Sequence, residues 1–111
     1  MSTVFSQIIE GTLPSEKVYE DERFIAIKDI SPLAPVHLLI IPKKEYSDLN
    51  AIPPEDHALF SEVVTIAQRL SQDWGVADNY RLITNIGPNA GQTVFHLHFH
   101  LIGGKQLGAM V

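Results

Sequence analysis

Three of the five histidines occupy alternate positions near the C-terminus, in the segment Phe95-His-Leu-His-Phe-His-Leu101. Alternation with a period of two is typical of a β-strand that has one polar and one apolar face. Side chains two residues apart on one face lie about 6.6 Å from each other, since each strand residue advances the chain by roughly 3.3 Å. We therefore expect a strand that buries its phenylalanines and leucines and presents the imidazoles of His96, His98 and His100 together on the opposite face.

The remaining hydrophobic patterns predict an α+β domain. Only one apolar stripe with helical spacing is long enough to cross a sheet, and it runs from Pro53 to a helix-ending Gly75. This favours a five-stranded, mainly antiparallel sheet with one long and one short helix. Because the 111 residues contain no repeat or long linker, we expect a single domain over residues 1–111. The short helix is expected at residues 4–10, before Gly11, and the other strands at residues 17–20, 24–28, 36–42 and 80–85.

Composition argues against several classes of protein. A formal net charge of −5 disfavours a protein that coats nucleic acid, because such proteins present a basic face. The chain has no cysteine, so disulfides and cysteine-based zinc sites are excluded. No apolar run approaches the roughly 20 residues of a membrane span, and the N-terminal residues lack the pattern of a signal peptide. We therefore expect a cytoplasmic protein with no nucleic-acid or membrane partner.

The histidine cluster admits three interpretations. A merely solvated polar face is disfavoured, because three imidazoles fall within five residues. Imidazoles that alternate on a strand can bind a transition metal, and three ligands with an open fourth position is a catalytic zinc arrangement. The rings can also act directly, since a neutral imidazole is a nucleophile near neutral pH. The spacing alone does not separate metal binding from covalent or acid–base catalysis.

The loop that precedes the histidines favours chemistry on a phosphate. It runs from Asn85 to Thr93 and contains Gly87 and Gly91. Glycines let main-chain N–H groups approach an anion closely, and a threonine adds a hydroxyl donor. Such loops are common, but this one leads directly into the histidines. A phosphate group held between the loop and the imidazoles is therefore the preferred interpretation.

The sequence resembles the histidine-triad family, and within it the histidine-triad nucleotide-binding (HINT) branch. The segment from His96 to Ile102 matches the signature in which histidines alternate with hydrophobic residues. The resemblance covers nearly the whole chain in order, and the tail Gly104–Val111 is similar to that of bacterial members. Further matching segments are Phe5–Gly11 with Leu13-Pro14, Tyr19–Asp21, Asp29–His37, Ile40–Lys44, Tyr80–Leu82 and Gly103-Gly104.

The resemblance implies a purine nucleoside 5′-phosphoramidate hydrolase. In the family the middle histidine, here His98, attacks the α-phosphorus, the amine leaves, and water releases the nucleoside monophosphate from a nucleotidyl-histidine. This sequence of steps needs a neutral nucleophile and a proton for the amine. By the same resemblance His100 contacts the phosphate or the leaving-group side, and His96 and His37 orient and tune His98.

The resemblance also implies how the nucleotide is held. The main chain of the glycine loop and a hydroxyl would bind phosphate oxygens, and an aspartate would bind the ribose hydroxyls. Ordinary core packing is the alternative role for the apolar residues that match the purine slot. The phosphate-binding set is Asn85, Gly91, Gln92 and Thr93, the ribose residue is Asp29, and the purine slot is Phe5, Ile8, Ile27 and Ile30.

Some positions depart from the family pattern. Certain bacterial relatives bind structural zinc through two cysteines, whose positions here are Thr3 and Ser6, and through a histidine where this chain has Glu45. We therefore predict no metal and no other cofactor. Ile27 stands where a phenylalanine is frequent, which predicts weaker stacking on the base or looser base selectivity.

The sequence is also compatible with two other functions. Hydrolysis of dinucleoside polyphosphates would use the same nucleophile with a different leaving group, and a non-enzymatic nucleotide-binding or scaffold protein would retain the pocket. A nucleotidyl transferase is disfavoured because its third motif position is typically glutamine, where this chain has His100. Relatives are homodimers, so the resemblance implies two sheets joined in a homodimer.

Overall fold

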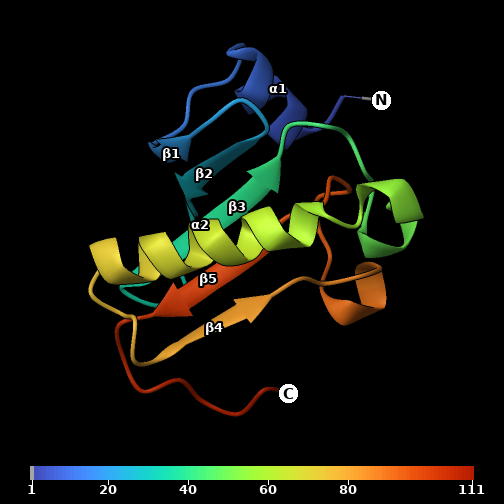
Figure 1. The fold of residues 1–111 in the computed structure, drawn as a ribbon. Helices are drawn as coiled ribbons and strands as arrows, with labels where there is room; N and C mark the ends of the chain where they lie inside the picture. Colours follow the sequence, from blue (N-terminus) through green and yellow to red (C-terminus); the bar gives the residue numbers. More distant parts are fainter. Residues whose placement is uncertain (1) are drawn as a thin grey trace.

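The computed structural model describes residues 2–111 as a five-stranded antiparallel sheet flanked by two helices (Figure 1). The order across the sheet is β1-β2-β3-β5-β4. The α+β architecture expected from the sequence is thus confirmed. The elements are α1 Val4–Glu10, β1 Lys17–Glu20, β2 Phe24–Lys28, β3 Val36–Pro42, α2 Leu59–Asp73, β4 Tyr80–Ile83 and β5 Phe99–Gly103, with short 3-10 turns at Leu49–Ala51, Pro54–Asp56 and Pro88–Ala90.

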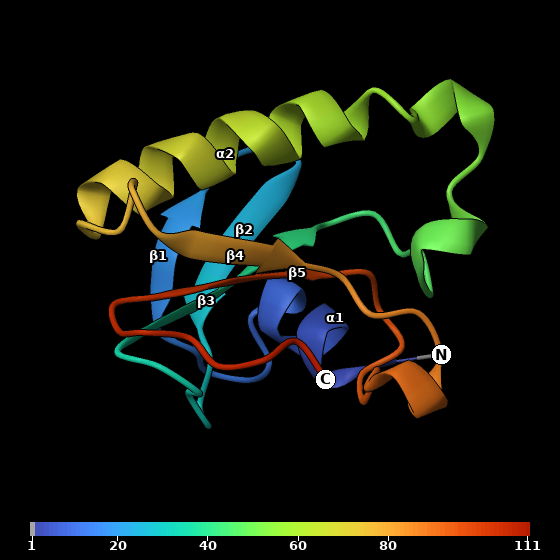
Figure 2. The same ribbon diagram turned by 90° about the horizontal axis from the view of Figure 1, so that it is seen from below.

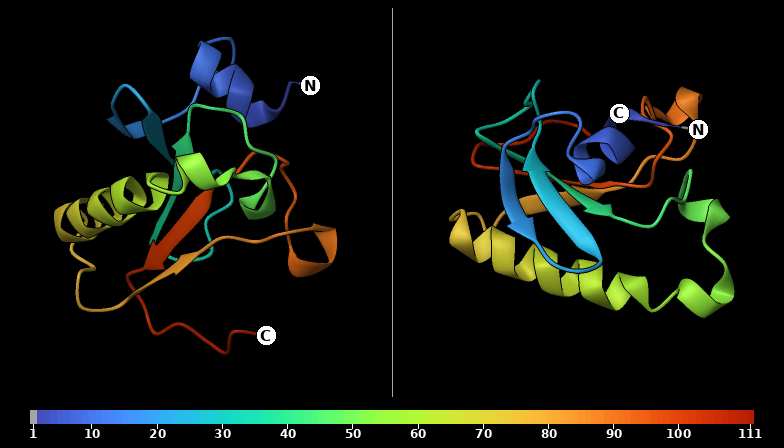
Figure 3. Two further views of the ribbon diagram at one scale, coloured as in Figure 1. Left: turned by 45° about the vertical axis from the view of Figure 1, so that its right-hand side comes forward. Right: turned by 90° about the horizontal axis from the view of Figure 1, so that it is seen from above.

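The two helices lie on opposite faces of the sheet (Figures 2 and 3). Strand β3 is buried at every position, as expected for a central strand covered on both sides. Its side chains alternate between two cores: Leu38 and Ile40 pack toward α2, whereas Leu39 and Ile41 pack with residues of α1. His37 precedes Leu39 on the same face as the α1 core. A polar residue is therefore fixed by an otherwise apolar central strand.

Helix α1 is closed at both ends by local sequence. Thr3 caps its N-terminus in a reciprocal arrangement with Ser6, in which each side chain accepts from the other residue's main-chain N–H. Gly11 ends the helix in the left-handed conformation, at φ 86°. The hydroxyls of Thr3 and Ser6 therefore serve as helix caps. Within residues 2–111, neither helix combines the length and apolarity needed to span a membrane.

Helix α2 begins later than expected. Pro54–Asp56 forms a separate 3-10 turn, and the α-helix starts at Leu59. The i to i+3 hydrogen bonds continue through the junction, from His57 N–H to Pro54 and from Phe60 N–H to His57. Val64 on this helix is 49% exposed. The buried residues of α2 are Leu59, Val63, Ile66, Ala67, Leu70 and Ser71.

The histidine strand is shorter than expected, because β5 starts only at Phe99. Pro42 ends β3 and has no N–H, so the ladder with β5 extends only to the pair Ile40–Phe99. Upstream, the N–H of Leu97 instead donates to the carbonyl of Tyr46, at 2.7 Å. Leu97, Phe99 and Leu101 are buried as expected, but Phe95 is 51% exposed. Strand β4 likewise stops at Ile83, two residues early.

Candidate active site

Four of the five histidines gather on the face of the sheet that carries α1. His37, His96 and His98 are buried, with 5%, 2% and 7% of their surface exposed, and His100 is half-buried. The ring centres of His98 and His100 lie 5.0 Å apart, and those of His37 and His100 lie 5.2 Å apart. Although His96 and His98 lie outside the regular strands and only His37 and His100 belong to β3 and β5, the expected juxtaposition of the imidazoles is present.

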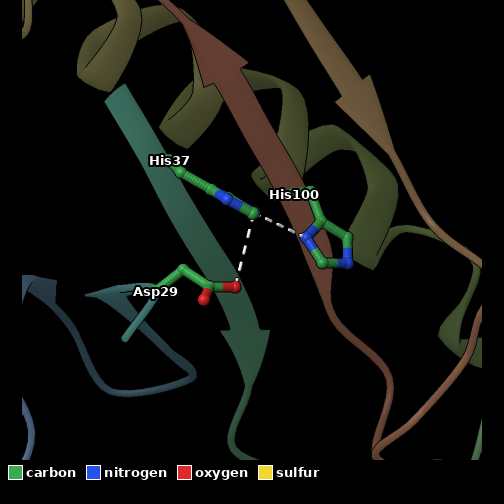
Figure 4. Close-up of side chains that lie close together, drawn as sticks. All are labelled: Asp29, His37 and His100. Carbon is green, nitrogen blue, oxygen red and sulfur yellow. Dashed lines mark hydrogen bonds and ion pairs between the residues drawn. The ribbon is translucent and has the colours of Figure 1, made fainter. Parts of the chain in front are cut away.

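The hydrogen bonds of His37 determine where its ring proton lies. The main-chain N–H of Leu33 points at His37 Nδ1, at 3.1 Å, so Nδ1 must be an acceptor. The neutral ring therefore carries its proton on Nε2, which lies 2.9 Å from His100 Nδ1 (Figure 4). His100 Nδ1 accepts a hydrogen bond from this N–H, so neutral His100 must carry its own proton on Nε2. One main-chain amide thus sets the tautomer of two rings.

His98 has the opposite tautomer. Its Nδ1 lies 2.7 Å from the main-chain carbonyl of His96, which can only accept, so Nδ1 carries the proton. In the neutral ring Nε2 then holds a free lone pair. The edge-on ring of Phe5, with centres 4.8 Å apart, packs against His98. The ring of His96 is fixed by Nε2, which donates to the carbonyl of Pro42 at 2.8 Å.

Burial favours the neutral form of His37, His98 and His100. Loss of solvation lowers the pKa of His98 and of His37 below the ordinary histidine value. Burial, with smaller contributions from His98 and His37, lowers the pKa of His100 to about 4. Near neutral pH the site therefore offers an unprotonated nitrogen on His98 and an N–H donor on His100.

Asp29 is the carboxylate of this site. Its Oδ2 lies 3.4 Å from His37 Nε2, and its side chain is 19% exposed. The other oxygen, Oδ1, accepts the main-chain N–H of Ser31 at 2.8 Å. The carboxylate therefore approaches the histidine pair with one oxygen already engaged and the other free to accept.

Three side chains place potential metal-ligand atoms within 4.8 Å of one another, those of Asp29, His37 and His100. A histidine that binds a metal through one nitrogen normally donates the N–H of the other nitrogen to an acceptor. The Nδ1 of His37 faces a donor instead, the N–H of Leu33. A metal on Nε2 would leave His37 without a proton on either nitrogen, so this donor set does not fit a metal ion.

The glycine loop is held by main-chain hydrogen bonds of its own, from Gly91 N–H to the Pro88 carbonyl and from Gln92 N–H to the Gly87 carbonyl. Gly91 has φ +99° and lies beside the half-buried Asn85 side chain. A Cβ added at Gly91 would be 3.8 Å from Asn85 Nδ2. Gly91 and Thr93 are exposed and therefore accessible to a ligand. Phosphate binding by Asn85, Gly91 and Thr93 stays a prediction.

Gln92 differs from the other three. Its side chain is 3% exposed and is engaged within the protein, where Oε1 accepts from the N–H of Gly87 at 2.9 Å. Its Nε2 donates to the carbonyls of Ser47 and Val94, at 2.8 and 3.2 Å. The carboxamide therefore ties the glycine loop to the segment after β3. Both ends of this carboxamide are engaged within the protein, and a role of Gln92 at the phosphate stays a prediction.

The residues expected in the purine slot do not all come together. Phe5, Ile8 and Ile27 share one buried cluster on the α1 face of the sheet. Ile30 does not join them, because its side chain is 97% exposed on the loop after β2. Core packing is thus excluded for Ile30, while the other three are packed against one another and, through Phe5, against His98.

Comparison with known proteins assigns the chain to a family. The model of the HIT domain matches residues 10–107. The chain belongs to the HIT domain family. A HIT-like protein of Chlamydia pneumoniae is 54% identical over 108 residues, which cover 97% of this chain and 98% of that protein. The resemblance to the histidine-triad superfamily is thereby confirmed.

Solved structures of HIT proteins show the same fold. A HIT family hydrolase from Clostridium thermocellum has a TM-score of 0.94 and 49% identity, with 99% of this chain and 96% of that chain covered. A histidine triad protein from Clostridium difficile has a TM-score of 0.93 and 38% identity, with 100% and 97% covered. The five-stranded sheet and its two helices are therefore those of a HIT domain.

Several groups that build this HIT site were not foreseen from the sequence. The N–H of Leu33 and the carbonyls of Pro42 and His96 orient three of the rings, yet main-chain groups leave no mark in side-chain patterns. Thr84 Oγ1 donates to the carbonyl of His98 at 2.8 Å. The only available signal for Thr84 was its position at the end of β4, beside the histidine segment.

Proposed function

We propose that this HIT protein belongs to the HINT branch and hydrolyses purine nucleoside 5′-phosphoramidates through a nucleotidyl-histidine. The observation that carries the proposal is the state of His98: a buried neutral ring whose Nδ1 proton is held by the His96 carbonyl and whose Nε2 lone pair is free. That is the form of imidazole that acts as a nucleophile. HIT relatives named as hydrolases, including the one from Clostridium thermocellum, support hydrolysis as the reaction class.

In the first step the lone pair on His98 Nε2 attacks the α-phosphorus. The P–N bond breaks with its electron pair on nitrogen, which takes up a proton from solvent and leaves as the neutral amine. His100 donates a hydrogen bond from its Nε2–H to the phosphate or the leaving nitrogen, because its Nδ1 is occupied by His37. In the second step water attacks phosphorus and releases one proton to solvent, the bond to His98 breaks with its electron pair returned to Nε2, and nucleoside monophosphate leaves.

The nucleotide would lie between the glycine loop and the α1 face. The side chains of Asn85 and Thr93 would donate to phosphate oxygens. Gly91, whose N–H is held by the Pro88 carbonyl, would let the phosphate approach the loop closely. Asp29 Oδ2 would accept from the ribose hydroxyls. Gln92 would contribute by holding the loop, and the purine would lie near Phe5, Ile8, Ile27 and the exposed Ile30.

We also propose a homodimer. Strand β4 is an edge of the sheet, and Leu82 on it is 40% exposed. Val64 on α2 is 49% exposed, and Met110 in the C-terminal tail is 84% exposed. Apolar side chains on an edge strand, a helix and a tail suit burial against a second copy. Light scattering should give twice the mass of one chain; a monomer at micromolar concentration would contradict this proposal.

The enzymatic proposal is tested by release of AMP from adenosine 5′-phosphoramidate. Wild type should turn the substrate over, and His98→Ala and His98→Gly should lose most of that turnover. His57→Ala is the matched control, because His57 is exposed and lies outside the cluster. Near-wild-type rates in both His98 variants would exclude His98 as the nucleophile. Efficient cleavage of diadenosine polyphosphate with no action on the phosphoramidate would favour the rival leaving group.

A further inference from the structure

The single ring proton of His37 lies between two acceptors. His37 Nε2 is 2.9 Å from His100 Nδ1 and 3.4 Å from Asp29 Oδ2, and Figure 4 shows the two contacts diverging from one edge of the ring. Because the N–H of Leu33 occupies Nδ1, the neutral ring has no second proton to offer. The hydrogen bond of this one donor is made to His100, and Asp29 Oδ2 is the second acceptor beside it.

The two oxygens of Asp29 are not equivalent. Oδ1 accepts the N–H of Ser31 and holds the loop. Oδ2 is the oxygen that approaches His37, and the Asp29 side chain is partly exposed, at 19%. A ligand that donates hydrogen bonds to Oδ2 would satisfy that oxygen in place of His37 Nε2. The natural donors for a single carboxylate oxygen are hydroxyl groups, and a ribose offers two adjacent ones.

We propose that Asp29 couples occupancy of the ribose site to the histidine pair: ribose hydroxyls that donate to Oδ2 release the His37 Nε2–H entirely to His100 Nδ1. His100 is then held with its own proton on Nε2, directed at the reacting phosphate. This deepens the proposed function and rests on it for the nature of the ligand. Asp29 would contact the substrate and act on the reacting centre through His37.

The coupling and simple ribose binding change different kinetic constants. A carboxylate that only grips the ribose contributes equally to ground state and transition state, so loss of the hydroxyls raises KM and leaves kcat unchanged. If the hydroxyls also release His37 toward His100, their loss lowers kcat. One net hydrogen bond corresponds to roughly five- to tenfold in rate.

The kinetic test compares adenosine 5′-phosphoramidate with its 2′,3′-dideoxy analogue, in wild type and in Asp29→Asn. The asparagine keeps an Oδ1 that accepts from Ser31 but has no carboxylate charge. In wild type the dideoxy substrate should lose roughly five- to tenfold in kcat, whereas the variant should turn over both substrates at similar kcat. An unchanged wild-type kcat, with only KM raised, would overturn the coupling, as would the full difference persisting in the variant.

A second measurement requires no turnover. Adenosine and 2′,3′-dideoxyadenosine are titrated into protein labelled with ¹⁵N in its histidine rings. Adenosine should shift the ring nitrogen signals of His37 and His100 in wild type but not in Asp29→Asn, while His57 stays constant as an internal control. Equal shifts with both nucleosides, or no binding of adenosine, would overturn the inference. A protein that shows the shifts but releases no AMP would instead contradict the proposed hydrolase.

Discussion

The Nδ1 proton of His98 is held by the main-chain carbonyl of His96 across 2.7 Å. These two residues belong to the same short extended segment, so the orienting acceptor moves with the ring it orients. The side chain of His96 in turn anchors that segment by donating to the Pro42 carbonyl at 2.8 Å. His96 therefore acts through its main chain on His98 and through its side chain on the end of β3.

Replacing His96 should affect stability and turnover together. His96→Ala removes a buried donor, leaves the Pro42 carbonyl without its side-chain partner and opens space beside Phe5. We expect a loss of about 2 to 4 kcal/mol in unfolding free energy and at least a tenfold loss in kcat as the carbonyl that holds His98 shifts. Urea denaturation and AMP release measure the two effects. A variant as stable as wild type but inactive would show that the anchoring role is wrong.

Gln92 and Thr93 offer a contrast between neighbouring residues. Gln92→Ala leaves the Gly87 N–H and the Ser47 carbonyl without their side-chain partners, so it should cost about 2 to 4 kcal/mol of stability. Thr93→Ala alters an exposed side chain and should change stability by less than about 0.5 kcal/mol while lowering turnover. Thermal denaturation and AMP release on both variants check this. The reverse pattern, a stable Gln92 variant and an unstable Thr93 variant, would contradict the account.

Gly91→Ala should weaken the phosphate cradle. The residue has φ +99°, which an L-residue rarely adopts, and the substitution should cost about 1 to 2 kcal/mol. Turnover should fall further than stability alone explains, because the main-chain N–H groups next to the phosphate would move. Gly108→Ala is the control, since no atom lies within 4 Å of its Cβ position and its φ is ordinary. Equal activity of the two variants would remove the loop from the proposed site.

Acid should destabilise the protein through its histidines. The pKa of His100 falls from 6.5 to about 4 on folding, and the pKa values of His37 and His98 are also lowered. Between those limits the unfolded chain binds more protons than the folded chain, so stability is complete above about pH 6.5 and falls as the pH drops toward 4. His100 alone should account for about 2 kcal/mol between about pH 7 and pH 5.

The pH effect has its own control. His100→Asn replaces the titrating ring with an uncharged side chain, so the loss of stability between neutral and mildly acidic pH should be smaller than in wild type. Chemical denaturation at a series of pH values gives the comparison directly. If wild type and variant lose stability in parallel, the lowered pKa of His100 is not the source of the acid sensitivity.

The sequence predicted the sheet, both helices and the cluster of imidazoles, because periodic patterns report which face of an element is buried. It misplaced the ends of β4, β5 and α2. Those ends depend on individual hydrogen bonds, such as Leu97 N–H to the Tyr46 carbonyl, that join segments distant in sequence. For the same reason, the sequence did not indicate that the Gln92 side chain is engaged within the protein. Nor did it indicate that the N–H of Leu33 orients His37.

Exposure was a second property that the pattern did not predict. Phe95 is 51% exposed although the alternation predicted its burial, and Ile30, which was expected to line the purine slot, is 97% exposed. Both lie outside regular strands, where side-chain direction no longer alternates. Periodicity therefore predicted the core of the sheet reliably and the loops around the site poorly.

The stereochemistry at phosphorus distinguishes a covalent intermediate on His98 from direct attack by water. A phosphorothioate analogue of adenosine 5′-phosphoramidate with one configuration at phosphorus is hydrolysed in ¹⁸O-labelled water, and the configuration of the product is determined. Attack by His98 followed by attack of water gives two inversions, so a nucleotidyl-histidine intermediate predicts net retention. Net inversion would mean that water attacks directly and would contradict the nucleotidyl-histidine.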